Sequence, residues 1–170
     1  MVDVVVIAGP AGVGKTSAAN EVSMQLRARG VAHAVVDTDA LDDVFPVPEN
    51  QWEITERHLA FMWTSYREIG TARLILTGVH LHDPAELRWI RRATTPGRVA
   101  LIRLDAHDET LAARVRAREI GSACEDQLAR TRRQAVDLRD GSDEGVSVIE
   151  TDGRPIADVA SEIIGILGWQ

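Results

Sequence analysis

Short apolar runs alternate along the chain with longer stretches that repeat apolar residues every three or four positions. The short runs are rich in β-branched residues, which is typical of buried strands, and the longer stretches have the period of amphipathic helices. Strands that alternate with helices build a parallel sheet with helices on both faces. We therefore predict an α/β fold with strands over residues 4–8, 31–36, 73–77, 99–104 and 146–150.

The helical stretches carry start and stop signals of their own. Gly30 and Gly70 each follow the last apolar residue of a periodic stretch, where glycine commonly ends a helix. Asp83, Pro84 and Glu86 combine a capping aspartate, a proline at the first helical position and a glutamate three residues after the cap. We predict helices over residues 17–29, 53–69, 108–119, 125–140 and 155–167, and one that begins at Pro84 after the capping Asp83.

Composition and charge narrow the class of protein. The 170 residues have the size of one domain, and 45% hydrophobic with 26% charged residues is typical of a globular protein, so we predict a single domain over residues 1–170. No apolar run is long enough to span a membrane, and Asp3 before the first run argues against a signal peptide. The single cysteine, Cys124, excludes an internal disulfide and suits the cytoplasm. A net charge of −7, with arginines dispersed among acidic residues, argues against nucleic acid as a partner.

The strongest chemical signal lies between the first strand and the first helix. Of the 19 basic side chains other than histidine, only Lys15 is a lysine. It belongs to a complete G-x-x-x-x-G-K-[ST] phosphate loop, followed directly by Ser17. The loop reads Gly9-Pro10-Ala11-Gly12-Val13-Gly14-Lys15-Thr16. Its amides and the Lys15 ammonium are expected to bind the phosphates of ATP, and the Thr16 hydroxyl to bind Mg²⁺.

A second candidate follows the second strand, where Asp37-Thr38-Asp39 places two carboxylates two positions apart. Ligands of open parallel sheets bind beyond the carboxyl ends of the strands. We expect Asp37 to support the metal and Asp39 to accept the proton of an attacking hydroxyl. Both aspartates are therefore also expected to contact the acceptor. The third strand runs into Thr77 without a carboxylate, which favours Asp37 for the metal. An ordinary Asp-rich turn is the alternative.

These features resemble the P-loop small-molecule kinases, which include shikimate kinase, gluconate kinase, adenylylsulfate kinase and chloramphenicol phosphotransferase. The chain is also similar to actinobacterial kinase-like ATPases. The resemblance covers nearly the whole chain in the order of its elements. It implies a three-layer α/β/α sandwich with strand order 2-3-1-4-5 and a helical lid near residues 114–133. The triple glycine of shikimate kinase is reduced here to Thr77-Gly78-Val79-His80, which argues against shikimate as the acceptor.

The same resemblance implies roles for three further segments. Arg114 and Arg118 share a helical face before a break at Gly121, and the resemblance makes them lid arginines that close over the phosphates; a solvated helix is the alternative. The connection around Gly153 is expected to border the adenine, although an ordinary turn explains it equally well. The acceptor pocket is expected between the second and third strands, where five of seven aromatic residues gather. The candidates there are Trp52, Trp63 and Arg67, and both tryptophans fit the core as well as a pocket.

The sequence thus predicts a cytoplasmic, ATP- and Mg²⁺-dependent phosphotransferase in which Lys15, Asp39 and Arg118 are catalytic. Its expected partners are a nucleoside triphosphate and a small-molecule acceptor, without nucleic acid or membrane, for a monomer or a homodimer. Two alternatives stay open: a nucleoside or nucleotide kinase, and an ATP-binding regulatory protein with weak ATPase activity.

Overall fold

The computed structural model of the chain describes residues 3–41, 43–78, 84–95, 97–118, 123–140 and 145–170. The predicted capping residue Asp83, the predicted helix break at Gly121 and the Val79-His80 pair lie outside these residues.

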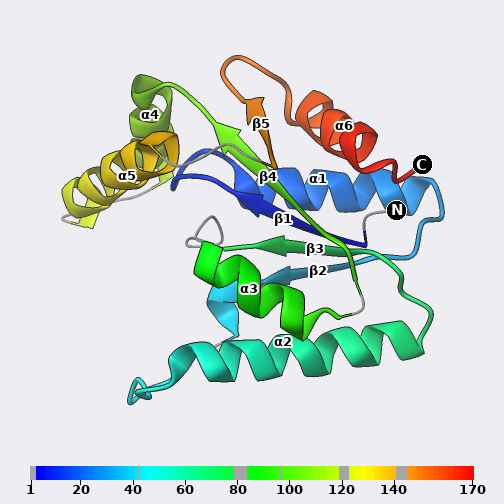
Figure 1. Cartoon of the computed structure of the whole chain (residues 1–170). Helices are drawn as coiled ribbons and strands as arrows, with labels where there is room; N and C mark the ends of the chain where they lie inside the picture. The colour runs from blue at the N-terminus through cyan, green and yellow to red at the C-terminus, as the bar shows by residue number, and fades with distance from the viewer. Residues whose placement is uncertain (1–2, 42, 79–83, 96, 119–122, 141–144) are drawn as a thin grey trace.

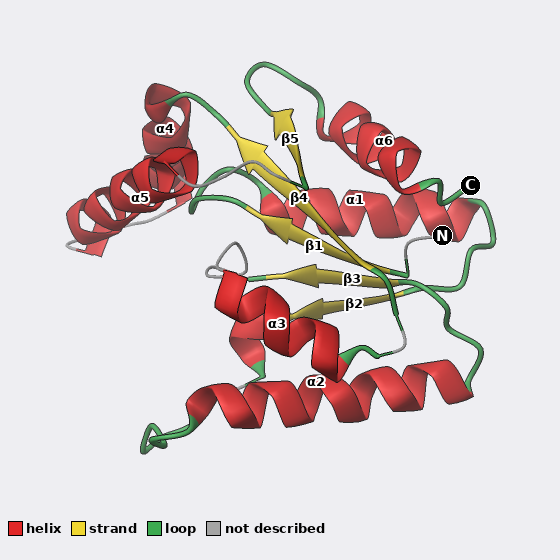
Figure 2. Cartoon of the chain, in the orientation of Figure 1, coloured by secondary structure: helices red, strands yellow, loops and turns green. Residues whose placement is uncertain are grey.

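Five parallel strands form the sheet that the sequence predicts, in the order β2-β3-β1-β4-β5 (Figures 1 and 2). Every residue of β1 is buried because this central strand is covered on both faces, which is why its sequence is a continuous apolar run. The strand order 2-3-1-4-5 is confirmed. The strands are β1 (Val4–Ala8), β2 (Ala34–Asp37), β3 (Leu74–Thr77), β4 (Val99–Asp105) and β5 (Val146–Glu150).

The six α-helices found in the described residues start and end close to the predicted limits. They are α1 (Lys15–Ala28), α2 (Gln51–Glu68), α3 (Pro84–Ala93), α4 (Asp108–Arg118), α5 (Ala123–Asp140) and α6 (Ile156–Leu167), with a short 3₁₀ turn, η1 (Thr38–Ala40). The second strand is shorter than predicted. Its predicted first residue, Val31, instead closes α1 by donating its amide to Leu26 O, and its own carbonyl accepts from the His33 ring.

The sheet separates two apolar layers, because successive residues of a strand point to opposite faces. Val5 and Ile7 of β1 pack against α1 and α6, whereas Val4 and Val6 pack against α2 and α3. Figure 1 shows these helix pairs on opposite sides of the sheet, with α4 and α5 beyond the carboxyl end of β4. The predicted three-layer sandwich is therefore confirmed.

None of the described helices combines the length and the apolar character that crossing a membrane requires.

Candidate functional site

The phosphate loop connects the carboxyl end of β1 to α1, and glycine is required at both ends of it. A Cβ on Gly9 would lie 2.6 Å from Leu104 O and 2.8 Å from Val13 Cγ1, which is too close for any side chain. Gly14 caps α1 with φ of +106°, a conformation that other residues rarely adopt, and it offers no side chain to the first-turn amides. Those amides and the positive end of the helix dipole are suited to an anion.

The Lys15 side chain folds back over this loop. Its Nζ donates to Gly9 O at 2.9 Å and to Pro10 O at 3.2 Å. Burial lowers the pKa of Lys15 below its ordinary value. Asp39 and Asp37 act on this pKa in the opposite direction, and Arg118 lowers it further. Two carboxylates and one guanidinium are thus electrostatically coupled to a single ammonium.

A cavity of about 710 Å³ opens above the loop at the carboxyl edge of the sheet. It brings together most of the residues that the sequence predicts for the site, from three separate parts of the chain: the phosphate loop, the Asp37–Asp39 segment and the two lid arginines. Its lining consists of residues 11–17, Asp37, Asp39, Thr77, Gly78, Arg114, Arg118, Gln127, Thr151, Arg154, Ile156 and Val159.

The Asp37–Asp39 segment is held at the edge of the cavity by its own hydrogen bonds. Asp37 Oδ1 accepts the Asp39 amide at 3.2 Å and so starts the η1 turn. The buried Thr38 hydroxyl donates to Thr77 O at 3.0 Å, which ties the end of β2 to the end of β3. Both carboxylates remain exposed and line the cavity.

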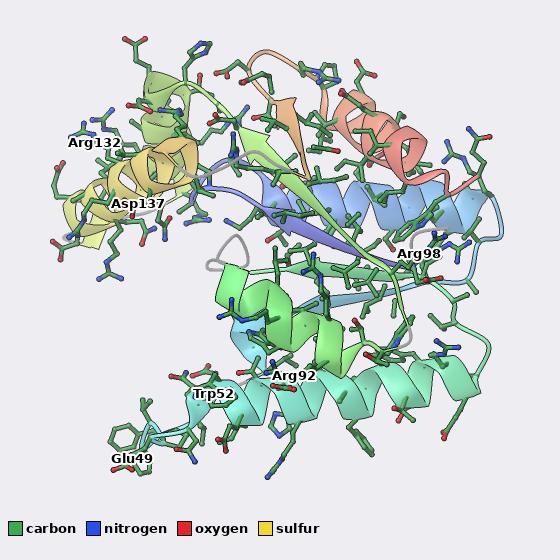
Figure 3. The ribbon with its side chains drawn as sticks, in the orientation of Figure 1. Glu49, Trp52, Arg92, Arg98, Arg132 and Asp137 are labelled. Atoms are coloured by element: carbon green, nitrogen blue, oxygen red, sulfur yellow. The ribbon has the colours of Figure 1, made fainter. Side chains whose placement is uncertain are left out.

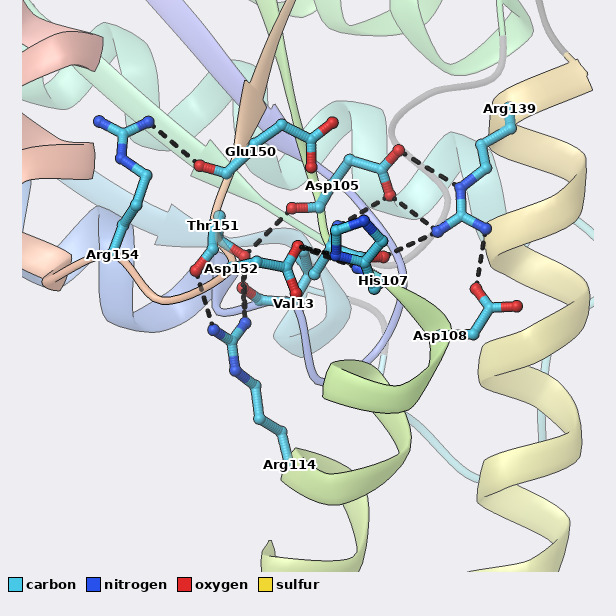
Figure 4. A network of polar contacts seen from close by, with 11 residues as sticks. Val13, Asp105, His107, Asp108, Arg114, Arg139, Glu150, Thr151, Asp152 and Arg154 are labelled. Atoms are coloured by element: carbon cyan, nitrogen blue, oxygen red, sulfur yellow. Dashed lines mark hydrogen bonds and ion pairs between the residues drawn. The ribbon is translucent and has the colours of Figure 1, made fainter.

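The two predicted lid arginines line the same cavity but differ in their contacts. The Arg114 guanidinium donates to Val13 O, Thr151 Oγ1 and Thr151 O at 3.0–3.1 Å, and Figure 4 shows it reaching from α4 to these groups. Arg118, one turn later, is exposed, and it acts on the pKa of Lys15. Arg114 therefore holds the phosphate loop against the β5–α6 connection, while Arg118 lines the cavity and acts electrostatically on Lys15.

Solved structures with a similar fold were found. The chain is similar to the tunicamycin resistance protein of Deinococcus radiodurans, with 20% identity, a TM-score of 0.63, and 99% of this chain and 96% of that one covered. It is similar to shikimate kinase of Acinetobacter baumannii in complex with shikimate, with 17% identity, a TM-score of 0.58, and 98% and 93% covered. It is also similar to APS kinase of Mycobacterium tuberculosis in complex with AMPPNP and APS, with 15% identity, a TM-score of 0.58, and 98% of both chains covered.

The chain has the fold of the P-loop small-molecule kinases. No family model matches it, and no curated protein matches its sequence. At such low identity the likeness establishes the P-loop kinase fold and leaves the chemistry to the residues of this chain.

Several predicted residues lie away from the cavity of this P-loop kinase fold. Trp63 is buried between α2 and α3, where its Nε1 donates to Thr94 O at 3.2 Å, and the Arg67 guanidinium stacks over its ring. These contacts keep both side chains in the helical layer, and neither lines the cavity. Trp52 is 53% exposed at the N-terminal end of α2 (Figure 3) and does not line the cavity either. Gly153 is an exposed turn residue between Thr151 and Arg154, which do line it.

Two glutamines of α5 belong to the site although sequence reasoning did not find them. Gln127 lines the cavity, and Gln134 Oε1 accepts the amide of Ala11 in the phosphate loop at 3.1 Å. The signal that could have found them is their neutrality, because the other polar side chains of α5 are nearly all charged and many face solvent, as Arg132 and Asp137 do in Figure 3.

The C-terminal half of α5 is fastened to the sheet by an ion-pair network (Figure 4). Arg139 pairs with Asp105 at 3.2 Å and Asp108 at 2.8 Å, and the hydrogen bonds that it donates to these carboxylates raise its pKa. Beside it, burial acts to raise the pKa of Asp152, but hydrogen bonds from Thr110 and His107 bring it below its ordinary value. The ion pairs of Arg139 therefore hold the C-terminal end of α5 in place.

Proposed function

We propose that this chain is an ATP- and Mg²⁺-dependent phosphotransferase that phosphorylates a hydroxyl group of a small molecule. The proposal rests on the observation that Lys15, Asp39 and Arg118 line the same cavity as a glycine-rich loop. Phosphoryl transfer is catalysed mainly by positioning and by neutralising charge, and this set supplies both. In the same proposal residues 1–170 form one domain, with a lid near residues 114–133.

The phosphate tail of ATP would lie on the loop. The amides of Gly12 and of residues 14–17 would be its hydrogen-bond donors, because the amides of Ala11 and Val13 already donate to Gln134 Oε1 and Pro10 O. Gly9, Pro10, Ala11 and Val13 would shape the loop behind them. Lys15 would exchange the Gly9 and Pro10 carbonyls for phosphate oxygens, which are anionic and therefore stronger acceptors. The base would lie at the end of the cavity lined by Thr151, Arg154, Ile156 and Val159, next to the turn at Gly153.

The donors present near the phosphates fit Mg²⁺. The Thr16 hydroxyl and the Asp37 carboxylate are both exposed in the cavity, and both are hard oxygen donors. Within the described residues no cluster of three or more acidic, histidine or cysteine side chains could hold a metal by itself. This suits Mg²⁺, which commonly takes one or two protein ligands and completes its shell with phosphate and water. When bound, Mg²⁺ neutralises charge on the phosphates.

Transfer would begin when the acceptor hydroxyl lies between Asp39 and the γ-phosphorus. The hydroxyl oxygen forms a bond to phosphorus, the bond from phosphorus to the bridging oxygen breaks, and the electron pair leaves with ADP. The hydroxyl proton passes to the Asp39 carboxylate. Arg118 would neutralise the charge that develops on the transferred group.

The acceptor would enter from the side of Asp39, and Trp52, which is exposed at the start of α2, would contact it there. An exposed indole offers a flat apolar surface to a small molecule at little cost in side-chain entropy. Trp63 and Arg67 pack elsewhere and are not part of this proposal.

The test is a thermal-shift screen followed by a transfer assay. Hydroxyl-bearing compounds of several classes are added together with Mg²⁺ and a non-hydrolysable ATP analogue. A compound that stabilises the protein only in that mixture is then incubated with ATP, and phosphorus NMR detects its phosphate ester. A protein that is not stabilised by ATP with Mg²⁺ would contradict the proposal.

A further inference from the structure

One peptide group of the phosphate loop is held from two sides. The carbonyl of Pro10 and the amide of Ala11 belong to the same planar unit and move together. The carbonyl accepts from Lys15 Nζ at 3.2 Å, and the amide donates to Gln134 Oε1 at 3.1 Å. Lys15 reaches this unit from inside the cavity, whereas Gln134 reaches it from α5 and does not line the cavity.

The side chain at position 134 has to be a neutral acceptor. The group that it meets is an N–H, so the amide oxygen and not the nitrogen must face it. Lysine and arginine have no acceptor to offer. A carboxylate would accept the same bond but would add a negative charge beside a site for anions. Glutamine meets both requirements.

Gln134 also lies on the part of α5 that is fixed to the sheet. The next residue, Ala135, is buried in the same apolar cluster as Val13. Leu138 is buried, and its carbonyl accepts from the buried Arg103 at 3.0 Å. The Gln134 amide is therefore held by a rigid support, as an orienting contact requires.

We propose that Gln134 is a positioning residue of the phosphate loop, which orients the Pro10–Ala11 peptide and, through the Pro10 carbonyl, sets the resting position of the Lys15 ammonium. The consequence for ATP rests on the proposed function; the link between Gln134 and Lys15 does not.

The chain offers a direct probe because Lys15 is its only lysine. Protein labelled with carbon-13 at the lysine Cε gives a single lysine signal. In Gln134→Leu, without nucleotide, this signal moves and hydrogen exchange of the Ala11 amide becomes faster. In Gln134→Glu the amide stays protected, because the carboxylate still accepts its bond. Should Gln134→Leu fail to fold, Gln134→Asn replaces it, since its shorter amide falls short of the loop.

Gln25→Leu is the matched control. Gln25 is another helix glutamine with a long-range bond, from its Nε2 to Ala157 O at 3.0 Å, but it joins α1 to α6. Its loss lowers stability without moving the lysine signal. ATP affinity falls about fivefold in Gln134→Leu, as expected for one lost hydrogen bond, and stays unchanged in Gln25→Leu.

The two proposals fail in different ways. A lysine signal that keeps its position in Gln134→Leu, or that moves as far in Gln25→Leu, overturns the role of Gln134 and leaves the function intact. A wild-type protein that does not bind ATP overturns the function, while the nucleotide-free signals still report on Gln134.

Discussion

The phosphate loop and the segment that leads into α2 differ in how the fold holds them. The loop is bound from outside by Gln134 of α5, by Arg114 of α4 and by Thr151 after β5. Residues 43–53 make mostly local contacts, such as Asn50 with Glu53, and leave Phe45 93% exposed. The phosphate side of the proposed site is therefore prepared in advance, whereas on the proposed acceptor side residues 43–53 mostly face solvent and do not line the cavity.

The difference shows which part of the proposed transfer site is positioned by the fold before any ligand binds. A phosphate tail is bound by backbone amides, and these must be positioned before the ligand arrives, because reorganising them would weaken every interaction with the charge. A small-molecule acceptor is recognised by side chains, which an open segment can change without disturbing the loop.

The largest effect is expected from Lys15→Ala, which removes the only ammonium of the prepared side. ATP affinity should fall about 100-fold with the loss of charge-assisted hydrogen bonds. Loss of charge neutralisation in the transition state should cost about another 100-fold in rate. Calorimetry and the transfer assay measure the two losses. Lys15→Arg is the matched control: it keeps the charge and should retain more of the affinity than of the rate, because a planar guanidinium cannot replace a compact ammonium. An alanine variant that still binds ATP normally contradicts the site.

Asp39→Asn tests the proposed base, which lies between the phosphate side and the acceptor side of the proposed site. Transfer to the acceptor should fall about 10³-fold, because an amide cannot accept the hydroxyl proton, while ATP affinity changes little. Asp43→Asn, an exposed carboxylate of the open segment, is the control and should leave both unchanged. An ATP-binding regulatory protein would be indifferent to Asp39→Asn, so unchanged turnover would favour that alternative.

The prepared side was also the predictable side. The loop from Gly9 to Thr16 is contiguous in sequence, and its chemistry depends on backbone and glycine, so the motif alone identifies it. Asp37 could be placed because the carboxyl ends of parallel strands meet at one edge. The contact between Ala11 and Gln134 joins distant parts of the chain, so the lack of charge at Gln134 could single out this residue but could not name its partner.

The acceptor side was less predictable for a physical reason. An aromatic residue on an amphipathic helix fits a core and a pocket equally well, and only tertiary packing separates the two. Trp63 packs in the core through its bond to Thr94 O, whereas Trp52 stays exposed. Arg114 and Arg118 lie one turn apart on one helix face, and no spacing rule could predict that Arg114 donates to the Val13 and Thr151 carbonyls.

Arg114→Gln and Arg118→Gln should therefore separate stability from catalysis. Arg114→Gln leaves the Val13 and Thr151 carbonyls without their guanidinium, which should lower the free energy of unfolding by about 1–3 kcal/mol. Arg118→Gln should change it by less than about 0.5 kcal/mol. Its transfer rate should nevertheless fall about 100-fold. Denaturant unfolding and the transfer assay measure the pair, and a stable Arg114→Gln would contradict the structural role of that arginine.

The pKa of Lys15 gives a smaller, purely electrostatic test. The single lysine signal should titrate below the ordinary lysine value, at still lower pH in Asp39→Asn and at higher pH in Arg118→Gln. Between the folded and unfolded pKa values the unfolded chain binds more protons, so this group's contribution to stability rises with pH there. Its destabilising effect is complete below the folded pKa. A titration at the ordinary value in the wild type would mean that the ammonium is hydrated and not held by the loop.

The smallest effect is expected on the open side, from Trp52→Ala. Because the indole is half exposed and its loss leaves no cavity, the free energy of unfolding should change by less than about 0.5 kcal/mol. ATP affinity should stay the same, since the prepared loop is untouched, whereas affinity for an acceptor found in the screen should fall about fivefold with the lost apolar contact. Phe61→Ala, another exposed aromatic of α2, is the control and should alter neither affinity. Equal acceptor affinity in wild type and Trp52→Ala would mean that the acceptor does not bind at the start of α2. The residues of the phosphate loop would still identify its ligand, whereas no residue would then identify the position of the acceptor.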